Sequence, residues 1–445
     1  MTAPGRTADL IVIGAGPKAA AIAAKTHVLN ELGYGPLQVK VVERREVGAS
    51  WTGRYGFTSG YEALGTQPEK DIGFPYQTAI RLGAPGQQID QAMLQFSWHS
   101  HLIQMGEYRR WVDLGTPRPT HREVARYLSW VLDRATNGVE LRLANVTHCE
   151  FSVDGWLVTC EKDGHCGEVL VAERGIVLTG PGASKTLPYA KEVAHRILSP
   201  KVKTEDLEAM YLPPAARICI IGGGESAVSM ALWLISKHGE DLGLTFVAPT
   251  LPYSRAESFF ENSVYSDPQL VGWGHLTEGQ RAEFVRRTDR GVMSIAALER
   301  LARHRALSFI VGRVQEIQRN PSGLARVVVN QADEMIRQEF DAVAICTGSS
   351  PAAELARLLG DSKSAVEERL GCSVADESSL MRQIDSTLAL RGLSPRIYLP
   401  TLAGLAQGPG FANLSSLGML SDCILLSCVY ATDEGVRSAL AETLL

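Results

Sequence analysis

Residues 11–19 read "IVIGAGPKA", and this short stretch decides the fold that the sequence predicts. An apolar strand leads into Gly14, Gly16 and Pro17, and a run of helix-forming residues follows. Gly14 permits a tight turn, Gly16 lets the backbone approach a pyrophosphate, and the small Ala19 lets the helix pack closely on the strand. The pyrophosphate would then lie at the positive N-terminus of the helix. The stretch therefore predicts the first βαβ unit of a dinucleotide-binding domain.

The next strand agrees with this interpretation. Its sequence is "VKVVE", and it ends at Glu43. An acid at about this distance from the glycine turn accepts hydrogen bonds from an adenosine ribose. The first site therefore suits the adenosine part of FAD.

A second glycine turn occurs at residues 220–227, "IIGGGESA", again between an apolar strand and a helix. The following strand, "LTFVAPT", has no acid at its end. That absence removes repulsion against a ribose 2′-phosphate, and Arg255 shortly afterwards could pair with such a phosphate. The second site therefore favours NADPH, with an exposed loop arginine as the plain alternative for Arg255.

The order of the remaining strands predicts how the two units are connected. "FDAVAICTGSSP" repeats the strand and Thr-Gly ending of "GIVLTGPG", and "RIYLP" follows in the last hundred residues. We predict an α/β protein in which an FAD-binding Rossmann-like domain is interrupted by a second Rossmann-like, NADPH-binding domain. The expected parts are the first section of the FAD domain at 1–215, the NADPH domain at 216–350, and a return to the FAD and substrate domain at 351–445.

The composition excludes several other classes of protein. The 445-residue chain has a net charge of −5 and no long basic run, which argues against a nucleic-acid partner. Its apolar stretches are too short and too often broken by glycine to span a bilayer. The N-terminus lacks the pattern of a secretion signal. We therefore expect a cytoplasmic protein with neither a nucleic-acid nor a membrane partner.

The eight cysteines are scattered and form no C-x-x-C pair, which argues against a disulfide reductase. One group of side chains could be imagined as a metal site: His148, Cys149, Cys160, His165 and Cys166. The segment that contains it reads as a hairpin with an Asp-Gly turn, and its spacings match no common zinc pattern. We therefore expect no metal.

Two dinucleotides in one chain, one a hydride donor and one a flavin, describe a flavoprotein oxidoreductase. Its electrons could pass to a partner or quinone, as in an electron-transfer reductase. They could instead pass to oxygen in a dry pocket, as in a monooxygenase.

Several longer stretches resemble a known family, and this resemblance indicates which electron acceptor the protein uses. They are "GAGPKAAAIAAK", "VERREVGASW", "LGTQPEKDIGFPY", "RPTHREVARYLSWV", "IGGGESA", "RAESFFENSVYSDP", "RTDRGVMS" and "LPTLAGLAQGPGFANLSSLGMLSD", and they cover nearly the whole chain in order. The chain resembles the N-hydroxylating flavin monooxygenases of siderophore pathways, most closely the mycobactin/nocobactin-type L-lysine N6-monooxygenases.

The resemblance implies a reaction in which the flavin does the chemistry. No protein nucleophile and no catalytic side chain is needed. NADPH reduces FAD, O2 forms a C4a-hydroperoxyflavin, and the neutral side-chain amine of L-lysine is oxidised to N6-hydroxylysine for a mycobactin-like siderophore. Such relatives are often oligomeric, which leaves a homo-oligomer open. Hydroxylation of ornithine or an acylated lysine, an electron-transfer flavoprotein reductase, and a nucleotide-binding regulator without turnover are the alternatives.

The resemblance also implies site residues. Lys70 and Asn262 match residues that bind the amino-acid substrate, although a surface lysine and a loop-capping asparagine are the plain alternatives. The cofactor contacts that it implies, together with those predicted above, are Gly14, Gly16, Pro17, Lys18, Glu43, Trp51, Gln67, Gly222, Gly224, Glu225, Ser226, Arg255, Ser294, Thr347 and Gly348. Val292 departs from the family pattern because ornithine hydroxylases have an asparagine there. The substrate-facing serine of relatives corresponds to either Leu426 or Ser427.

Overall fold

The first sheet is built around strand β1 (Thr7–Ile13), in which Ala8, Leu10, Ile11 and Val12 are buried. Strand β1 pairs in parallel with β2 (Val39–Glu43) on one side and with β6 (His165–Leu178) on the other. Helix α1 (Pro17–Glu31) begins directly after the glycine turn, and its interior residues are buried against this sheet. The computed structural model describes residues 7–56, 58–162, 165–198 and 210–429.

The strand order of the first sheet is β3-β2-β1-β6-β5-β4, and a late strand joins it. That strand, β19 (Arg396–Tyr398), pairs in parallel with β6, so the chain returns to the first sheet as predicted. The hairpin predicted at the Asp-Gly turn is confirmed, because Ser152 faces Gly155 across the antiparallel β4–β5 pair. The other strands of this sheet are β3 (Val139–Leu143), β4 (Asn145–Ser152) and β5 (Gly155–Lys162).

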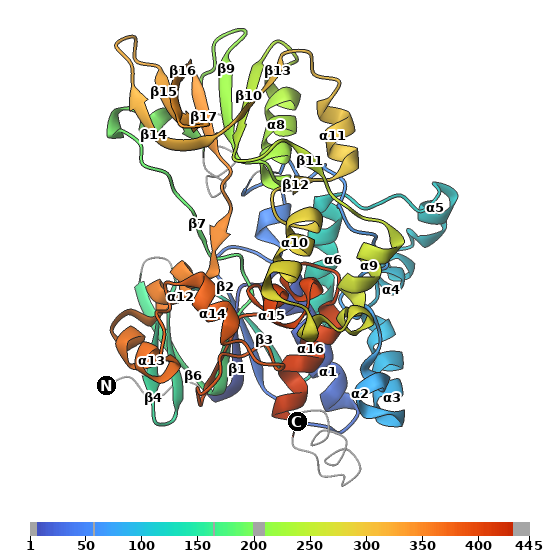
Figure 1. Ribbon diagram of the computed structural model, residues 1–445. Coiled ribbons are helices and arrows are strands. Elements are labelled where there is room, and N and C mark those ends of the chain that lie inside the picture. Colours follow the sequence, from blue (N-terminus) through green and yellow to red (C-terminus); the bar gives the residue numbers. More distant parts are fainter. Residues whose placement is uncertain (1–6, 57, 163–164, 199–209, 430–445) are drawn as a thin grey trace.

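Helices surround this sheet in the lower part of Figure 1. Helix α6 (His121–Arg134) begins with a capping box, in which Thr120 and Glu123 satisfy each other's backbone N–H groups. Its apolar face joins α1 in a large buried core. The other described helices of this part are α2 (Thr78–Leu82), α3 (Ala84–Met93), α4 (Trp98–Gln104), α5 (Tyr108–Asp113), α12 (Pro351–Leu359), α13 (Lys363–Leu370), α14 (Glu377–Arg382), α15 (Ala403–Gln407) and α16 (Leu417–Leu425).

The second sheet forms the upper part of Figure 1 and has the order β13-β10-β9-β17-β8. All of its pairs are parallel. Helix α8 (Glu225–His238) follows its glycine turn and packs on one face of this sheet, and a three-stranded antiparallel sheet packs on the other face. The elements of this part are β8 (Ile197–Leu198), β9 (Arg217–Ile221), β10 (Gly243–Ala248), β13 (Leu307–Val311), β14 (Arg313–Arg319), β15 (Ala325–Gln331), β16 (Glu334–Phe340), β17 (Ala342–Ile345) and helix α11 (Ile295–Leu301).

The predicted fold class is confirmed, since two dinucleotide-binding units are present and the second interrupts the first. The chain crosses between them at β7 (Ala183–Ser184) and β18 (Ser349–Ser350), which pair with each other. Strand β8 precedes residue 216 yet belongs to the second sheet. The exact boundaries at 215/216 and 350/351 therefore remain a prediction.

The segment between β10 and α11 reaches back to the first unit. It contains β11 (Tyr253–Ser254), α9 (Phe259–Ser266), α10 (Glu278–Thr288) and β12 (Val292–Met293). Its Trp273 donates from Nε1 to the Leu405 carbonyl oxygen at 3.1 Å, and Arg281 donates to that of Ala406 at 3.2 Å. This inserted segment therefore forms a wall beside the helices of the C-terminal part.

Two further observations limit the class of protein. Among the described residues, no helix combines the length and the apolar character that crossing a membrane requires. Within the same residues, no three His, Cys, Asp or Glu side chains gather as a metal site would need. The side chains of His165 and Cys166, which belonged to the imagined metal group, lie outside the described part of the chain.

Candidate functional site

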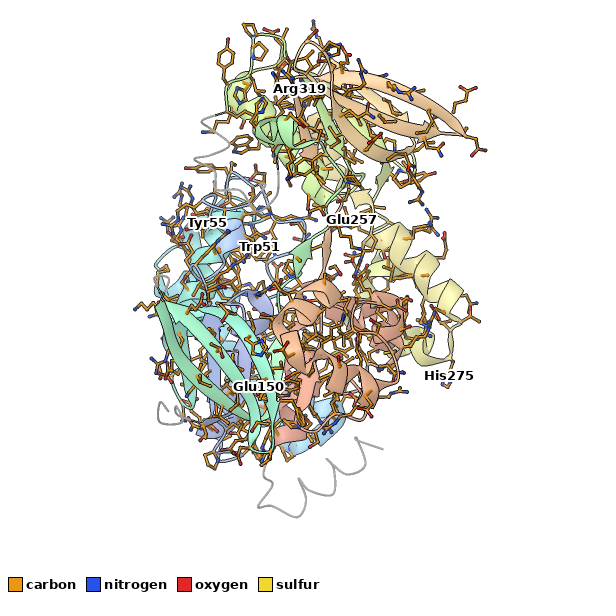
Figure 2. The ribbon with its side chains drawn as sticks, turned by 90° about the vertical axis from the view of Figure 1, so that its left-hand side faces the viewer. Trp51, Tyr55, Glu150, Glu257, His275 and Arg319 are labelled. Atoms are coloured by element: carbon orange, nitrogen blue, oxygen red, sulfur yellow. The ribbon has the colours of Figure 1, made fainter. Side chains whose placement is uncertain are left out.

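A cavity of about 910 Å³ lies between the two units and is lined by both of them. This volume is near the upper end of the range for small-molecule and cofactor sites, roughly 300–1,000 Å³. Figure 2 labels Trp51 and Tyr55 of the first unit and Glu257 of the inserted segment at the waist where the units meet. All three residues line the cavity.

The first glycine turn gives this cavity an anion-binding end. Gly14 has a φ of +99°, and a Cβ there would meet the Thr179 hydroxyl oxygen at 3.0 Å. Gly16 precedes α1, and a Cβ added to it would meet nothing within 4 Å. The helix has no side-chain cap and no acid in its first turn. Its first N–H groups are therefore available to a pyrophosphate.

Glu43 lies at the carboxyl end of β2, where the sequence predicts an adenosine ribose. One carboxylate oxygen accepts from the Ala15 N–H at 2.9 Å, and the other accepts from the Arg45 N–H at 2.9 Å. These bonds fix the carboxylate beside the glycine turn. A carboxylate has further lone pairs, so it can also accept from ribose hydroxyls.

Lys18 is a buried cation in the first turn of α1, with only 8% of its surface exposed. Its ammonium group donates to the Ala412 carbonyl oxygen at 2.9 Å. Burial lowers the pKa of Lys18 to about 8, and the nearby negative charge of Asp289 partly opposes that shift. A cation at a helix N-terminus is also unfavourable in itself. The arrangement therefore suits a site that binds an anion.

Trp51 and Gln67 both line the cavity as the resemblance implies. The Trp51 ring stacks on His121, with 5.9 Å between the ring centroids. The Thr58 hydroxyl lies 2.8 Å from His121 Nδ1, and burial lowers the pKa of His121. His121 also lines the cavity, although it was not among the predicted site residues.

Lys70 and Asn262 come from different units, and the fold brings them together. The Lys70 ammonium donates to Asn262 Oδ1 at 2.9 Å, and both residues line the cavity. The Asn262 amide group donates to the carbonyl oxygens of Glu257 and Ser258 at 2.9 and 3.0 Å. Burial lowers the pKa of Lys70. The pair thus places a cation and an amide where an amino acid's α-carboxylate could bind.

The second glycine turn approaches strand β17 closely. Gly222 has a φ of +139°, and a Cβ there would lie 2.4 Å from the Cys346 carbonyl oxygen. Glu225, the first residue of α8, accepts from both the N–H and the hydroxyl of Ser294 at 2.8 Å. Arg255 Nη2 lies 3.8 Å from the Glu225 carboxylate, while the buried Nε of Arg255 has no hydrogen-bond partner. Because the Arg255 side chain lines the cavity, its guanidinium group could donate to a phosphate of a bound ligand.

The predicted site residues divide into two groups. Four of them, Gly222, Gly224, Ser294 and Thr347, do not line the cavity, and their contact with a cofactor remains a prediction. The Ser294 N–H and hydroxyl both donate to the Glu225 carboxylate, and the Thr347 hydroxyl donates to the Lys185 carbonyl oxygen. The predicted residues that line the cavity are Gly14, Gly16, Pro17, Lys18, Glu43, Trp51, Gln67, Lys70, Glu225, Ser226, Arg255, Asn262 and Gly348.

The positions that depart from the family pattern also lie away from the cavity. Val292 is buried in β12, and the Ser427 hydroxyl donates to the Ile424 carbonyl oxygen. Neither they nor Leu426 are among the lining residues. Asp289 and Asn413 also line the cavity; both lie in stretches that resemble the family, but neither was predicted as a site residue. Only the packing of the inserted segment on the C-terminal part places them there.

Comparisons with known proteins agree with this geometry. Residues 91–351 match the family model for L-lysine 6-monooxygenase/L-ornithine 5-monooxygenase. The L-lysine N6-monooxygenase MbtG of Mycobacterium sp. strain MCS is 37% identical over 439 residues, which cover 98% of this chain and 97% of that protein. MbtG of Mycobacterium tuberculosis H37Rv is 35% identical over 94% of each chain. The solved structure of the lysine monooxygenase NbtG from Nocardia farcinica has a TM-score of 0.80 at 36% identity, covering 94% of this chain and 100% of that one.

Proposed function

Since the chain belongs to the L-lysine 6-monooxygenase/L-ornithine 5-monooxygenase family, we propose that it is an FAD- and NADPH-dependent L-lysine N6-monooxygenase. The product would be N6-hydroxylysine for a mycobactin-like siderophore, made in the cytoplasm. The observation that carries the proposal is that two dinucleotide turns flank one cavity that also holds the Lys70–Asn262 pair.

The residues present fit FAD at the first turn. The open N-terminus of α1 would hold the pyrophosphate, Glu43 the ribose, and Trp51 and Gln67 the flavin end of the cavity. At the second turn, Ser226 and Arg255 would hold NADPH, with the Arg255 guanidinium group donating to a phosphate. FAD reduced by NADPH would supply the oxygen-activating chemistry.

The protein's own contribution is binding, orientation and exclusion of water. Lys70 would pair with the substrate carboxylate, and Asn262 would hold the α-amino acid group beside it. Fixing these groups orients the substrate's side chain within a cavity walled by both units. No side chain needs to act as a nucleophile.

The decisive experiment is a product assay on the purified, FAD-loaded enzyme. Hydroxylamine product is measured with NADPH and L-lysine, L-ornithine, N6-acetyl-L-lysine or no amine. We expect N6-hydroxylysine to dominate. Absence of this product despite bound FAD and NADPH oxidation would refute the proposal, and electron transfer to a partner would then be the better account.

Lys70→Ala tests the substrate role of this cation. We expect the KM for lysine to rise about 10-fold or more, because a charge-assisted hydrogen bond to the carboxylate is lost. The rate of flavin reduction by NADPH without substrate should change little. The matched control is Lys363→Ala, since Lys363 is partly exposed, does not line the cavity, and has Glu367 as an ion-pair partner at 3.8 Å. Slower flavin reduction with an unchanged KM would contradict the carboxylate role.

The quaternary structure is a separate part of the proposal. A homo-oligomer is expected only from the resemblance, and light scattering of the FAD-loaded enzyme measures it directly. A monomeric mass at micromolar concentration would remove that expectation without affecting the proposed reaction.

A further inference from the structure

We propose that Arg118 of the first unit and Arg255 of the inserted segment together bind one phosphate group of NADPH. This inference rests on the function proposed above and extends it to a residue with no assigned role. Arg118 lies in a stretch that resembles the family, but it was not among the predicted site residues.

Backbone contacts place Arg118 in the cavity wall. It lies three residues before α6, and the N–H group of Leu64 donates to the carbonyl oxygen of Pro119 at 2.8 Å. This contact holds the segment around Arg118 beside Gly65. The Gly65 carbonyl oxygen accepts from Nη1 of Arg118 at 3.2 Å, and both residues line the cavity.

Arg255 reaches the same glycine from the inserted segment. A Cβ added to Gly65 would lie 3.4 Å from Nη1 of Arg255. The other terminal nitrogen of Arg255, Nη2, lies 3.8 Å from the carboxylate of Glu225, the first residue of α8. Arg118 is therefore connected to the predicted NADPH turn through Gly65 and Arg255, and each step of this connection is a short distance.

The charges at this place explain why two arginines are needed. The Glu225 carboxylate accepts from the N–H and hydroxyl groups of Ser294 and lies close to Arg255, so it offsets part of the Arg255 charge. An acid in the first turn of α8 also opposes an anion at that helix N-terminus. Among the described residues, the structure gives Arg118 the Gly65 carbonyl oxygen as a partner and no carboxylate within ion-pair distance. Arg118 therefore supplies positive charge that no acid offsets.

A phosphate group is the ligand that fits these two side chains. An arginine has five N–H donors in a planar fork, so Arg118 keeps donors for a ligand besides the one that Gly65 accepts. A phosphate has several acceptor oxygens and pairs well with guanidinium groups. The N-terminus of a helix after a glycine turn is where the phosphates of a dinucleotide bind. NADPH bound in this way would contact both units at once.

Arg118→Gln is the sharpest test, because an amide can still donate to a carbonyl oxygen but carries no charge. The binding of NADP+ to the FAD-loaded protein is measured by isothermal titration calorimetry. We expect the Kd to rise about 10- to 100-fold, the loss of a hydrogen bond from a charged group. The KM for NADPH should rise with it, whereas the KM for L-lysine and the FAD content should stay near their original values.

The same variant shows which phosphate is bound. A rise in KM confined to NADPH would place Arg118 on the 2′-phosphate, and an equal rise for NADH would place it on the pyrophosphate. Both results support the proposal, since each requires a phosphate between the two arginines.

Two further variants keep the test decisive. Arg122→Gln makes the same chemical change four residues later, at an exposed arginine that does not line the cavity and donates to the Tyr61 hydroxyl at 3.0 Å. It should leave the Kd of NADP+ unchanged. Arg118→Lys retains the charge but loses the planar fork, so its Kd should lie between those of the original protein and the Gln variant. If the Gln variant does not fold, an unchanged Kd in the Lys variant would contradict binding by the guanidinium group.

An unchanged Kd of NADP+ in a folded Arg118→Gln variant would overturn the proposal. A raised KM for L-lysine or a loss of FAD with an unchanged Kd would also overturn it. Arg118 would then serve the substrate, or hold the flavin end of the cavity through Gly65. Failure of the proposed function is distinguishable from these results, because NADP+ binding is measured without hydroxylation, whereas that failure is the absence of N6-hydroxylysine from the unmodified enzyme.

Discussion

Replacing Lys18 with methionine should show by how much a buried cation at the start of α1 lowers the free energy of unfolding. The pKa of Lys18 falls from 10.5 to about 8, mainly through burial. That difference means that holding the proton in the FAD-free fold costs about 3 kcal/mol. The unfolded chain keeps this proton up to about pH 10.5, whereas the folded protein loses it near pH 8. The unfolded state therefore binds more protons within this window, and the free energy of unfolding rises with pH across it.

The assay is urea unfolding of the FAD-free protein and of its Lys18→Met variant at several pH values. Other groups titrate in the same window, so the quantity of interest is the difference between the two proteins. Between about pH 7 and pH 9.5 the original protein should gain about 2 kcal/mol relative to the variant. At neutral pH the free energy of unfolding of the variant should be about 2 kcal/mol higher. Removing the buried cation gains about 3 kcal/mol, and losing the hydrogen bond to Ala412 costs about 1 kcal/mol.

The FAD-loaded protein provides a second comparison. Negative charge bound in the same cavity favours protonated Lys18, so saturating FAD should reduce the pH dependence of this difference. A difference that does not change with pH in the FAD-free proteins would refute the reasoning. Lys18 would then not be a buried, partly deprotonated cation.

Three more predictions follow from single contacts. Glu43→Gln should lower the FAD content of the dialysed protein, measured by flavin absorbance, because an amide has only one acceptor oxygen in place of the two that now hold Ala15 and Arg45. Arg255→Ala should raise the KM for NADPH about 10-fold and leave that for NADH unchanged, since only NADPH carries the 2′-phosphate; equal effects on both cofactors would contradict that pairing. Thr120→Ala removes the cap of α6 and should lower the free energy of unfolding, measured with urea, by about 1 kcal/mol. An unchanged free energy of unfolding would contradict a stabilising role of the capping box.

The parts of the fold that local physics controls could be predicted from the sequence. The glycine turns, the strands that precede them and the α6 capping box each depend on residues within one short segment. The return of β19 to the first sheet was also predictable, because an interrupted domain must complete its core after the interruption. In each case the residues that carry the signal are neighbours in sequence or obey a connection rule.

The cavity wall was harder to predict, because it is made where distant segments pack. His121, Asp289 and Asn413 lie in stretches that resemble the family, but the stretches do not indicate which of their side chains face the cavity. Only the fold brings these three residues to one cavity. Ser294 shows the opposite case. Its position agrees with a cofactor contact by resemblance, but its N–H and hydroxyl groups both bind the Glu225 carboxylate. A sequence pattern specifies which residue occurs, whereas its hydrogen-bond partner depends on packing.

Polar contacts of the inserted segment limit how the two units can move relative to each other. Glu225 connects α8 to Ser294 and Arg255, and so fastens the second sheet to the inserted segment. Trp273 and Arg281 fasten that segment to the C-terminal part of the first unit. Any displacement of the NADPH-binding unit must break one set of links or carry the substrate wall with it. Arg255→Ala weakens the first set, so a change in lysine KM alongside the change in NADPH KM would show that the two sites are coupled through this segment.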